Sequence, residues 1–300
     1  MTTVVALGGN AVLRAGDRGT AAEQRARIRE TCVALAPLLE GEVVLTHGNG
    51  PQVGNELLRQ ERAAAEVPPL PLYLAVAQTQ AEIGALLATE LAAVGRGAAC
   101  LLTHVLVSED DPAFERPSKP IGPFYKRARA RTLEQERGWT MVEDAGRGWR
   151  RTVPSPAPLE IVELELVRAL VATGAAAIAC GGGGIPVVRR DGRLNGIDAV
   201  IDKDRASALL AVALGAERLV ILTDVPALMR AFGTPGEEPI AELSIGEAEE
   251  LLPELPPGSM SPKVEAALAF VRATEADALI TSAESLTAAL AGRAGTRIAP

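Results

Sequence analysis

Lysine is rare in this chain and occurs at positions where a positive charge could act on an anion. Lysine and arginine total 30 residues, but the lysines are only Lys119, Lys126, Lys203 and Lys263. The lysine ammonium is compact and mobile, whereas the arginine guanidinium is a rigid planar fork. A chain that otherwise uses arginine therefore predicts a chemical role for some of these lysines. Lys126 lies in the basic run YKRARAR and is interpreted as a surface residue.

Two of these lysines occur where a helix favours an anion. In the stretch GSMSPK, Ser261 is the predicted N-cap, which places Lys263 in the first helical turn. Lys203 opens another predicted helix, between Asp202 and Asp204. The positive end of the helix dipole disfavours a cation at both places, so an external anion such as phosphate is expected to complete the arrangement. The two aspartates are expected to orient the lysines or to hold Mg²⁺ through water.

Three glycine-rich segments each follow a predicted buried strand. They read LGGN at 7–10, THGNGP at 46–51 and CGGGGIP at 180–186. Glycine lets backbone N–H groups approach an anion closely, and the proline of the second segment fits the start of a helix. One such segment alone would indicate only a tight turn. Three of them at strand ends predict an anion site at one edge of a sheet.

The elements that must position these residues alternate between strand and helix patterns. The predicted strands are 3–7, 43–46, 98–107, 175–179, 219–223 and 278–281. The predicted helices are 21–39, 51–65, 76–94, 159–173, 203–214, 246–252 and 262–274. The strands are short, continuously apolar runs, as expected for strands that are buried on both faces. The alternation predicts an α/β fold with a mostly parallel sheet covered by helices on both faces.

The segment 109–158 breaks this alternation. It is rich in charge, proline and glycine, and it contains both tryptophans of the chain. These features predict a small inserted lid subdomain. Lys119 lies in this segment between prolines, which would aim its ammonium group stiffly.

Composition excludes several classes of protein. A net charge of -8 argues against nucleic acid or an anionic membrane as the main partner. Cys32, Cys100 and Cys180 have no metal-site spacing, so a reducing cytoplasm is expected. No apolar stretch predicts a membrane span. The chain also has neither the GxGxxG motif of dinucleotide enzymes nor the GxxxxGK[ST] motif of P-loop NTPases.

The remaining candidates for chemistry are weaker. His47 and His104 are the only histidines, and they show no metal-ligand or catalytic-triad spacing. His47 is interpreted as a residue that hydrogen-bonds within its loop. Cys180 precedes four glycines and is interpreted as a buried cysteine at a strand end. No metal-ligating residue is assigned directly from the sequence.

Seven motifs occur in order along nearly the whole chain: ALGGNAVL, THGNGPQVGNELLRQ, KPIGPFY, EDAGRGWRRTVPSP, CGGGGIPVV, AVIDKDRAS and GSMSPKVEAA. Their order and spacing resemble the carbamate kinase branch of the amino acid kinase family. The resemblance implies a single domain over 1–300 with a three-layer αβα fold and the inserted lid at 109–158. It also implies reversible phosphoryl transfer from ATP to carbamate with Mg²⁺, a homodimer and a place in arginine metabolism.

The resemblance, together with the charge argument above, assigns roles to particular residues. The expected catalytic residues are Lys203, Lys263, Lys119 and Asp204. The expected substrate-binding residues are Gly8, Gly9, Asn10, Gly48, Asn49 and Gly50. The expected nucleotide-binding residues are Gly182, Gly183, Thr223, Asp224 and Met260. No general base is required, because a carbamate oxygen is already an anionic nucleophile.

The chain departs from the family pattern at 222–230, which reads LTDVPALMR and lacks the aromatic residue that commonly helps to hold the nucleotide. This departure predicts weak discrimination between adenine and guanine nucleotides. Two alternative functions remain open at this point. One is a related kinase that acts on an acyl carboxylate, and the other is a nucleotide-sensing homologue without turnover.

Overall fold

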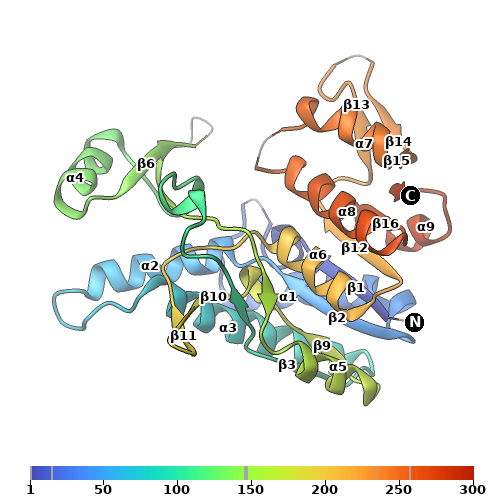
Figure 1. Ribbon diagram of the computed structural model, residues 1–300, viewed down its shortest axis with the longest axis horizontal. Helices are drawn as coiled ribbons and strands as arrows, with labels where there is room; N and C mark the ends of the chain where they lie inside the picture. The colour runs from blue at the N-terminus through green and yellow to red at the C-terminus, as the bar shows by residue number, and fades with distance from the viewer. Residues whose placement is uncertain (1, 15, 145–147, 235, 257) are drawn as a thin grey trace.

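A computed structural model describes residues 2–14, 16–144, 148–234, 236–256 and 258–300. Within these residues, the centre is an eight-stranded sheet in the order β15-β17-β16-β12-β1-β2-β9-β3 (Figure 1). Its strands are β1 (Thr2–Leu7), β2 (Glu42–His47), β3 (Ala98–Cys100), β9 (Ala176–Ile178), β12 (Arg218–Thr223), β15 (Glu242–Ser244), β16 (Ala278–Ser282) and β17 (Thr296–Ala299). The described pairings are parallel except that of β16 with β17. The predicted mostly parallel sheet is confirmed.

Helices cover both faces of this sheet. The α-helices of the described residues are α1 (Ala21–Ala34), α2 (Gly50–Ala63), α3 (Leu72–Ala93), α4 (Arg127–Arg137), α5 (Leu164–Ala172), α6 (Lys203–Leu214), α7 (Ile245–Leu251), α8 (Ser261–Thr274) and α9 (Leu286–Leu290), of which α2 and α4 do not pack on this sheet. Apolar residues of α1, α3 and α9 pack on one face, and those of α5, α6, α7 and α8 pack on the other. Because successive strand residues point to opposite faces, each central strand contributes to both cores. The three-layer αβα architecture is therefore confirmed.

Smaller sheets lie beside the central one. A four-stranded sheet contains β4 (His104–Leu106), β8 (Glu160–Ile161), β10 (Ile185–Arg190) and β11 (Arg193–Gly196). A two-stranded sheet pairs β13 (Leu228–Arg230) with β14 (Glu238–Ile240). One-turn helices include η1 (Gly9–Ala11) and η4 (Gly181–Gly183), which follow β1 and β9.

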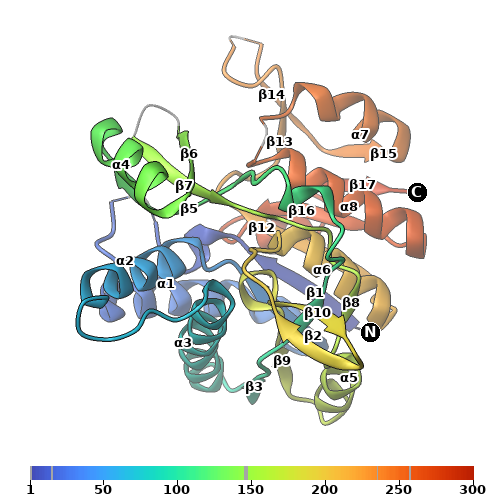
Figure 2. The ribbon, with the colours of Figure 1, turned by 60° about the vertical axis from the view of Figure 1, so that its left-hand side comes forward.

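The segment 109–158 forms a separate small layer. It holds β5 (Lys119–Tyr125), β6 (Thr140–Glu143) and β7 (Trp149–Val153) in the order β5-β7-β6, together with α4. Figure 2 shows this layer in green beside α2. A Cβ atom added at Gly54 of α2 would lie 3.4 Å from the Cα of Gly122, so the two backbones are in close contact. That this layer is a separable lid remains a prediction, and residues 145–147 of its EDAGRGW motif lie outside the described residues.

Three sequence-based expectations were wrong in detail. The predicted helix 159–173 begins only at Leu164, because Glu160–Ile161 pair with β4 as the strand β8. The predicted strand 98–107 is divided, because β3 belongs to the central sheet and β4 to the four-stranded one. At Thr103 between them, the side-chain amide of Gln80 accepts from the backbone N–H at 3.0 Å and donates to the carbonyl at 3.2 Å. Ser261 is not the N-cap of α8; it is the first helical residue, and its hydroxyl donates to Glu265.

Two further features concern covalent links and membranes. Cys32, Cys100 and Cys180 are all free thiols, so no disulfide crosses the fold. Among the described residues, no helix combines the length and the apolar character needed to cross a bilayer. The cytoplasmic location inferred from cysteine usage stays a prediction.

A buried carboxylate joins α1 to α3. The Glu90 side chain of α3 is 1% exposed and accepts from Arg25 Nε at 2.5 Å and from Arg29 Nε at 2.9 Å. The hydrogen bonds from Arg29 and Arg25 outweigh burial and lower the pKa of Glu90 to about 2. The ionised form of Glu90 is therefore the one that stabilises this helix pair.

We predict that Glu90→Gln lowers the free energy of unfolding at pH 7. Because the folded pKa of Glu90 lies below its ordinary value of 4.5, its contribution is complete above that value and is lost as pH falls toward about 2. The difference between wild type and variant should therefore shrink as the pH is lowered through this window. Urea unfolding at several pH values measures it. A difference that grew on acidification would contradict the assignment.

Candidate active site

Two lysines from different helices meet at one buried carboxylate. Asp204 is 3% exposed, and its Oδ1 lies 2.5 Å from the Nζ of Lys203 in the same first turn of α6. Its Oδ2 lies 3.2 Å from the Nζ of Lys263, which reaches across from α8. Lys263 also donates to the carbonyl of Ser259 at 3.2 Å. Asp204 therefore holds two ammonium groups close together and orients both.

A second aspartate joins the lid segment to the same helix. Asp202 is the N-cap of α6, and its Oδ1 accepts from the backbone N–H of Asp204 at 2.9 Å. Its other oxygen accepts from the Nζ of Lys119 at 2.7 Å. Lys119 is the first residue of β5, so the lid segment supplies the third cation. The three lysines singled out from the sequence thus converge on two neighbouring carboxylates.

Burial and charge act against each other in this cluster. Burial alone would raise the pKa of Asp204, but Lys203 and Lys263 outweigh it and hold that pKa below its usual range. Burial likewise opposes ionisation of Asp202, yet Lys119 lowers its pKa to about 2. Burial lowers the pKa of Lys203, and the attraction of Asp204 limits the shift. The carboxylates therefore stay ionised, and the charge of Asp204 offsets part of the cost of burying Lys203.

The second glycine segment lies directly beside Lys203. A Cβ atom at Gly48 would lie 3.5 Å from Cδ of Lys203, so the lysine stem passes over this glycine. Asn49 is the N-cap residue of α2, and its side-chain amide donates to the hydroxyl of Thr79 at 2.9 Å. Because the first N–H groups of a helix have no partner within the helix, Gly50 begins an anion-binding helix end. Of the expected substrate-binding residues, Gly48, Asn49 and Gly50 therefore lie on the Lys203 side of the cluster.

The third glycine segment forms η4 behind the second one. Gly182 has a φ of 65°, and a Cβ there would overlap the Asn49 side chain at 2.2 Å. Gly183 has a φ of 90°, and a Cβ there would lie 2.2 Å from the carbonyl oxygen of Ile201. Both positions therefore require glycine. The assignment of Gly182 and Gly183 to the nucleotide stays a prediction, although the geometry places them against the α2 and α6 starts.

A cavity of about 680 Å³ opens on the other side of Lys263. It includes the expected residues Gly8, Gly9, Asn10, Thr223, Asp224 and Met260. A Cβ at Gly8 would lie 2.7 Å from the carbonyl oxygen of Leu222, so β1 and β12 can approach here only because Gly8 has no side chain. The cavity joins the loops after β1, β12 and β16 with the segment before α8, and its volume is in the range of small-molecule sites. Gly182 and Gly183 are not among its lining residues.

Comparisons with known proteins agree with this geometry. The model of the amino acid kinase family matches residues 1–282. The carbamate kinase of Halobacterium salinarum is 47% identical, over 99% of this chain and 98% of its own. The structure of Giardia lamblia carbamate kinase bound to AMP-PNP superposes with a TM-score of 0.92 at 39% identity, over 99% of this chain and 98% of that one. Another structure of the Giardia lamblia protein, thiocarbamoylated by disulfiram on a cysteine, gives a TM-score of 0.89 at 38% identity, with the same shares covered.

This chain belongs to the carbamate kinases of the amino acid kinase family. The members of this family are ATP-dependent kinases, so ATP is the expected ligand of the cavity beside Lys263. These similarities cover nearly the whole length of both chains, so residues 109–158 and the C-terminal strands are included in them.

The structure shows cavity residues that sequence reasoning missed. They come from three loops: Arg14 after β1, Phe232 after β13 and Glu284 after β16. Phe232 is 63% exposed and lines the cavity, so an aromatic side chain is available although 222–230 lacks one. An exposed phenylalanine shortly after an apolar strand was the only sequence signal for this residue.

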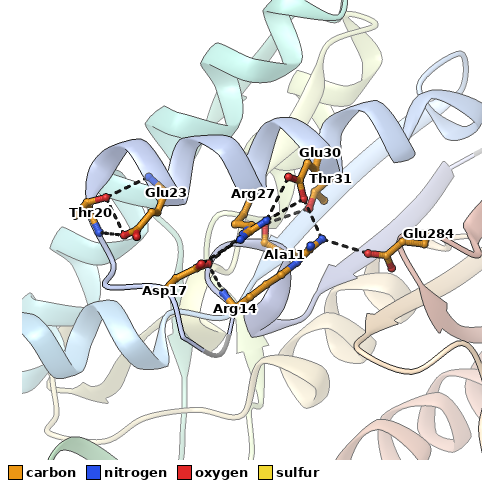
Figure 3. Close-up of polar contacts among 9 residues, drawn as sticks. All are labelled: Ala11, Arg14, Asp17, Thr20, Glu23, Arg27, Glu30, Thr31 and Glu284. Atoms are coloured by element: carbon orange, nitrogen blue, oxygen red, sulfur yellow. Dashed lines mark hydrogen bonds and ion pairs between the residues drawn. The ribbon is translucent and has the colours of Figure 1, made fainter.

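Arg14 connects the loop after β1 to the loop after β16 (Figure 3). Its Nη2 lies 3.0 Å from Glu30 of α1 and 3.2 Å from Glu284. The backbone N–H of Arg14 donates to the carboxylate of Asp17. The Arg27 guanidinium donates to both oxygens of the same carboxylate and lowers the pKa of Asp17 to about 2. Arg14 is thus held by contacts with α1, with Asp17 and with the loop after β16.

The charged cluster leads to a prediction about stability. In Asp204→Asn, two buried ammonium groups lose their shared counter-ion, so the free energy of unfolding should fall by about 3–5 kcal/mol. In Lys263→Met, Asp204 keeps Lys203 as a partner, so the loss should be smaller. Chemical unfolding of both variants without ligand measures the difference. Equal stability of Asp204→Asn and wild type would show that the cluster is not held together in this way.

The cavity leads to a prediction about nucleotide binding. If Phe232 stacks on the base, Phe232→Ala should raise the KM for ADP by about tenfold, because base–aromatic stacking contributes about 1–3 kcal/mol. The KM for the second substrate should not change. Leu166→Ala on α5 is the matched control, because Leu166 is also an exposed apolar residue but does not line the cavity. An unchanged KM for ADP in Phe232→Ala would exclude stacking.

Proposed function

We propose that this protein catalyses reversible phosphoryl transfer between ATP and carbamate, giving ADP and carbamoyl phosphate. The observation that carries the proposal is the convergence of Lys203, Lys263 and Lys119 on two buried aspartates, between the nucleotide cavity and the glycine loop 48–50. Both reactants are anions, so bringing them together requires several fixed cations and N–H dipoles in one place. The likeness to carbamate kinases over the full chain supports the same reaction.

The reaction divides between the two sides of the cluster. A carbamate oxygen attacks the γ-phosphorus of ATP and forms a new P–O bond, while the bond from that phosphorus to the β,γ-bridging oxygen breaks. The electron pair of the broken bond stays on the ADP oxygen. Lys263 lines the nucleotide cavity and would neutralise the phosphates, whereas Lys203 lies on the glycine loop and would meet the transferred group. No proton has to be removed from the nucleophile.

The placement of the glycines refines their proposed roles. Gly8, Gly9 and Asn10 line the nucleotide cavity near Lys263. We therefore assign them to the phosphoryl group that is transferred between ATP and carbamate. Gly48, Asn49 and Gly50 would bind the carbamate side. We reassign Gly182 and Gly183 from the nucleotide to support of the Asn49 loop, since they pack against Asn49 and Ile201.

The donor set is consistent with Mg²⁺ that arrives with the nucleotide. Among the described residues, no group of three or more His, Cys, Asp or Glu side chains could hold a metal ion alone. Asp202 and Asp204 are each engaged by lysine, which favours their orienting role. Mg²⁺ binds readily through substrate phosphates and water with few protein ligands, and Asp224 in the cavity is an available carboxylate. Bound there, it would neutralise phosphate oxygens.

A coupled assay tests the proposed function. ATP formed from ADP and carbamoyl phosphate should be detected by hexokinase and glucose-6-phosphate dehydrogenase, and it should require Mg²⁺. Acetyl phosphate and N-acetylglutamyl phosphate, offered in the same assay, separate this reaction from that of an acyl-carboxylate kinase. Nucleotide binding without ATP formation from any donor would identify a sensing homologue and overturn the proposal.

Two further parts of the proposal rest on the family resemblance. We propose a homodimer, which sedimentation equilibrium should detect as twice the chain mass of 31.2 kDa. We also keep the cytoplasm as the proposed location, in line with three unpaired cysteines.

The same thiols lead to a prediction about inhibition. Cys32 and Cys180 are fully buried, and burial raises the pKa of Cys32 to about 12, whereas disulfide exchange requires the thiolate. Cys100 is partly buried, and burial raises the pKa of its thiol as well. We therefore expect disulfiram, which modifies a cysteine of the Giardia lamblia protein, to leave the folded chain unmodified and active. Mass spectrometry before and after unfolding in urea tests this, with all three thiols reacting only when unfolded. Rapid modification of the folded protein with loss of turnover would contradict it.

A further inference from the structure

His47 is a buried residue with one nitrogen in use. It ends β2, is 0% exposed, and its Nδ1 lies 3.0 Å from the carbonyl oxygen of the next residue, Gly48. A carbonyl oxygen can only accept, so Nδ1 carries the hydrogen. The other nitrogen, Nε2, is then an acceptor, and it has no hydrogen-bond partner among the described residues. It lies against Gly181, where a Cβ would approach it to 2.4 Å.

An unpaired buried acceptor lowers the stability of the fold. An apolar residue of similar size at position 47 would avoid that loss, since His47 ends a strand whose residues Val43 and Leu45 lie in the apolar core on the α3 side. Burial also lowers the pKa of His47 to about 4, so the ring is neutral and is not a further cation beside Lys203. The one bond that the ring makes, to Gly48, is therefore the feature that distinguishes histidine here.

That bond fixes the direction of a peptide group. In a trans peptide the C=O and N–H groups point in opposite directions, so holding the Gly48 carbonyl toward His47 turns the Asn49 N–H away from it. The residues of this segment alternate between faces. Thr46 bonds Ser207 of α6 at 2.6 Å and Gly48 meets the Lys203 stem, whereas the side chain of Asn49 bonds Thr79 of α3. The His47 ring lies beside Gln80 of α3, so the carbonyl that it holds faces the α3 side, and the N–H of the same peptide, that of Asn49, faces the α6 side.

We propose that His47 is a positioning residue that holds the Gly48–Asn49 peptide so that the Asn49 N–H and the Lys203 ammonium face the same bound anion. The anion is the transferred phosphoryl group or carbamate, which rests on the proposed function. The device is an uncharged clamp, because the hydrogen-bonded nitrogen belongs to the neutral ring. Loss of the clamp frees the peptide to turn and removes a donor that does not have to be reorganised during transfer.

The tautomer provides a first test that needs no activity. The chain has two histidines, His47 and His104, so a ¹⁵N-histidine spectrum contains two rings. The Nδ1 of His104 also faces an acceptor, the Glu163 carboxylate, so the His47 signal is identified as the one that His47→Leu removes. We expect that ring to be neutral with its hydrogen on Nδ1 at pH 7. A His47 ring with its hydrogen on Nε2 would overturn the proposal, because Nδ1 could not then donate to Gly48.

Two variants of His47 provide the second test. In His47→Asn the amide nitrogen lies as many bonds from Cα as Nδ1 does and can donate to the same carbonyl, whereas Leu has a methyl group there. We expect His47→Leu to lower kcat/KM for carbamoyl phosphate by about 10²-fold, in the range for loss of one oriented donor, and Asn to restore most of it. The KM for ADP should stay unchanged in both, because residues 47–49 do not line the nucleotide cavity.

A matched control and the melting temperature separate positioning from folding. His104→Leu removes the only other histidine, which bonds Glu163, and should leave kcat/KM unchanged. His47→Leu should melt close to wild type without ligand, since it removes the unpaired Nε2 but also takes the donor from the Gly48 carbonyl. Wild-type kinetics in His47→Leu, or equal losses in His47→Leu and His47→Asn, would overturn the proposal.

A third measurement distinguishes failure of this inference from failure of the proposed function. The chain has four asparagines, so selective ¹⁵N labelling gives four backbone amide signals, of which one is Asn49. Titration with inorganic phosphate should shift the Asn49 amide in wild type and not in His47→Leu, even if carbamoyl phosphate is not turned over. If wild type forms no ATP but shows this shift, the proposed reaction is wrong, whereas the proposed positioning role of His47 is retained. No shift in wild type would overturn the clamp.

Discussion

The site depends on one constraint, which is that several ammonium groups must stay charged and close together before any anion arrives. Asp204 meets this constraint for Lys203 and Lys263, and Asp202 meets it for Lys119. Because the lysines come from α6, α8 and the lid segment, the two carboxylates also fix the relative positions of three parts of the chain. Both carboxylates lie in one turn, so this arrangement depends on the start of a single helix.

The central sheet determines where that turn lies. The loops after β1, β2 and β12 leave the same edge of a parallel sheet, which brings LGGN, HGNG and the nucleotide loop together although they are far apart in the sequence. Because successive strand residues point to opposite faces of the sheet, neighbouring side chains of a loop contact different helices. Along β2 and its extension, Thr46 and Gly48 meet α6, while Asn49 meets α3. One loop can therefore present a glycine to a lysine on one side and anchor itself on the other.

Much of this could be predicted from the sequence, because strands buried on both faces and helices with caps leave local signals. The scarcity of lysine identified the three cations, and their places beside Asp202 and Asp204 indicated an anion site. The rim of the nucleotide cavity could not be predicted in the same way. Arg14, Phe232 and Glu284 meet only because three distant loops pack together, and no local pattern encodes that approach. The errors at Thr103 and Ser261 have the same origin, since side chains of Gln80 and Glu265 decided them.

The pairing of Lys119 with the N-cap of α6 has a consequence for how tightly ligands are held. If Lys119 meets the substrate as proposed, it would exchange one anion for another on binding, so the gain would be the difference between two contacts and not the whole of one. The affinity of the site for phosphate would therefore be moderate. For a transfer that runs in both directions, such moderation favours departure of whichever anions have just been made, and the aspartate that regains its lysine contributes to their release.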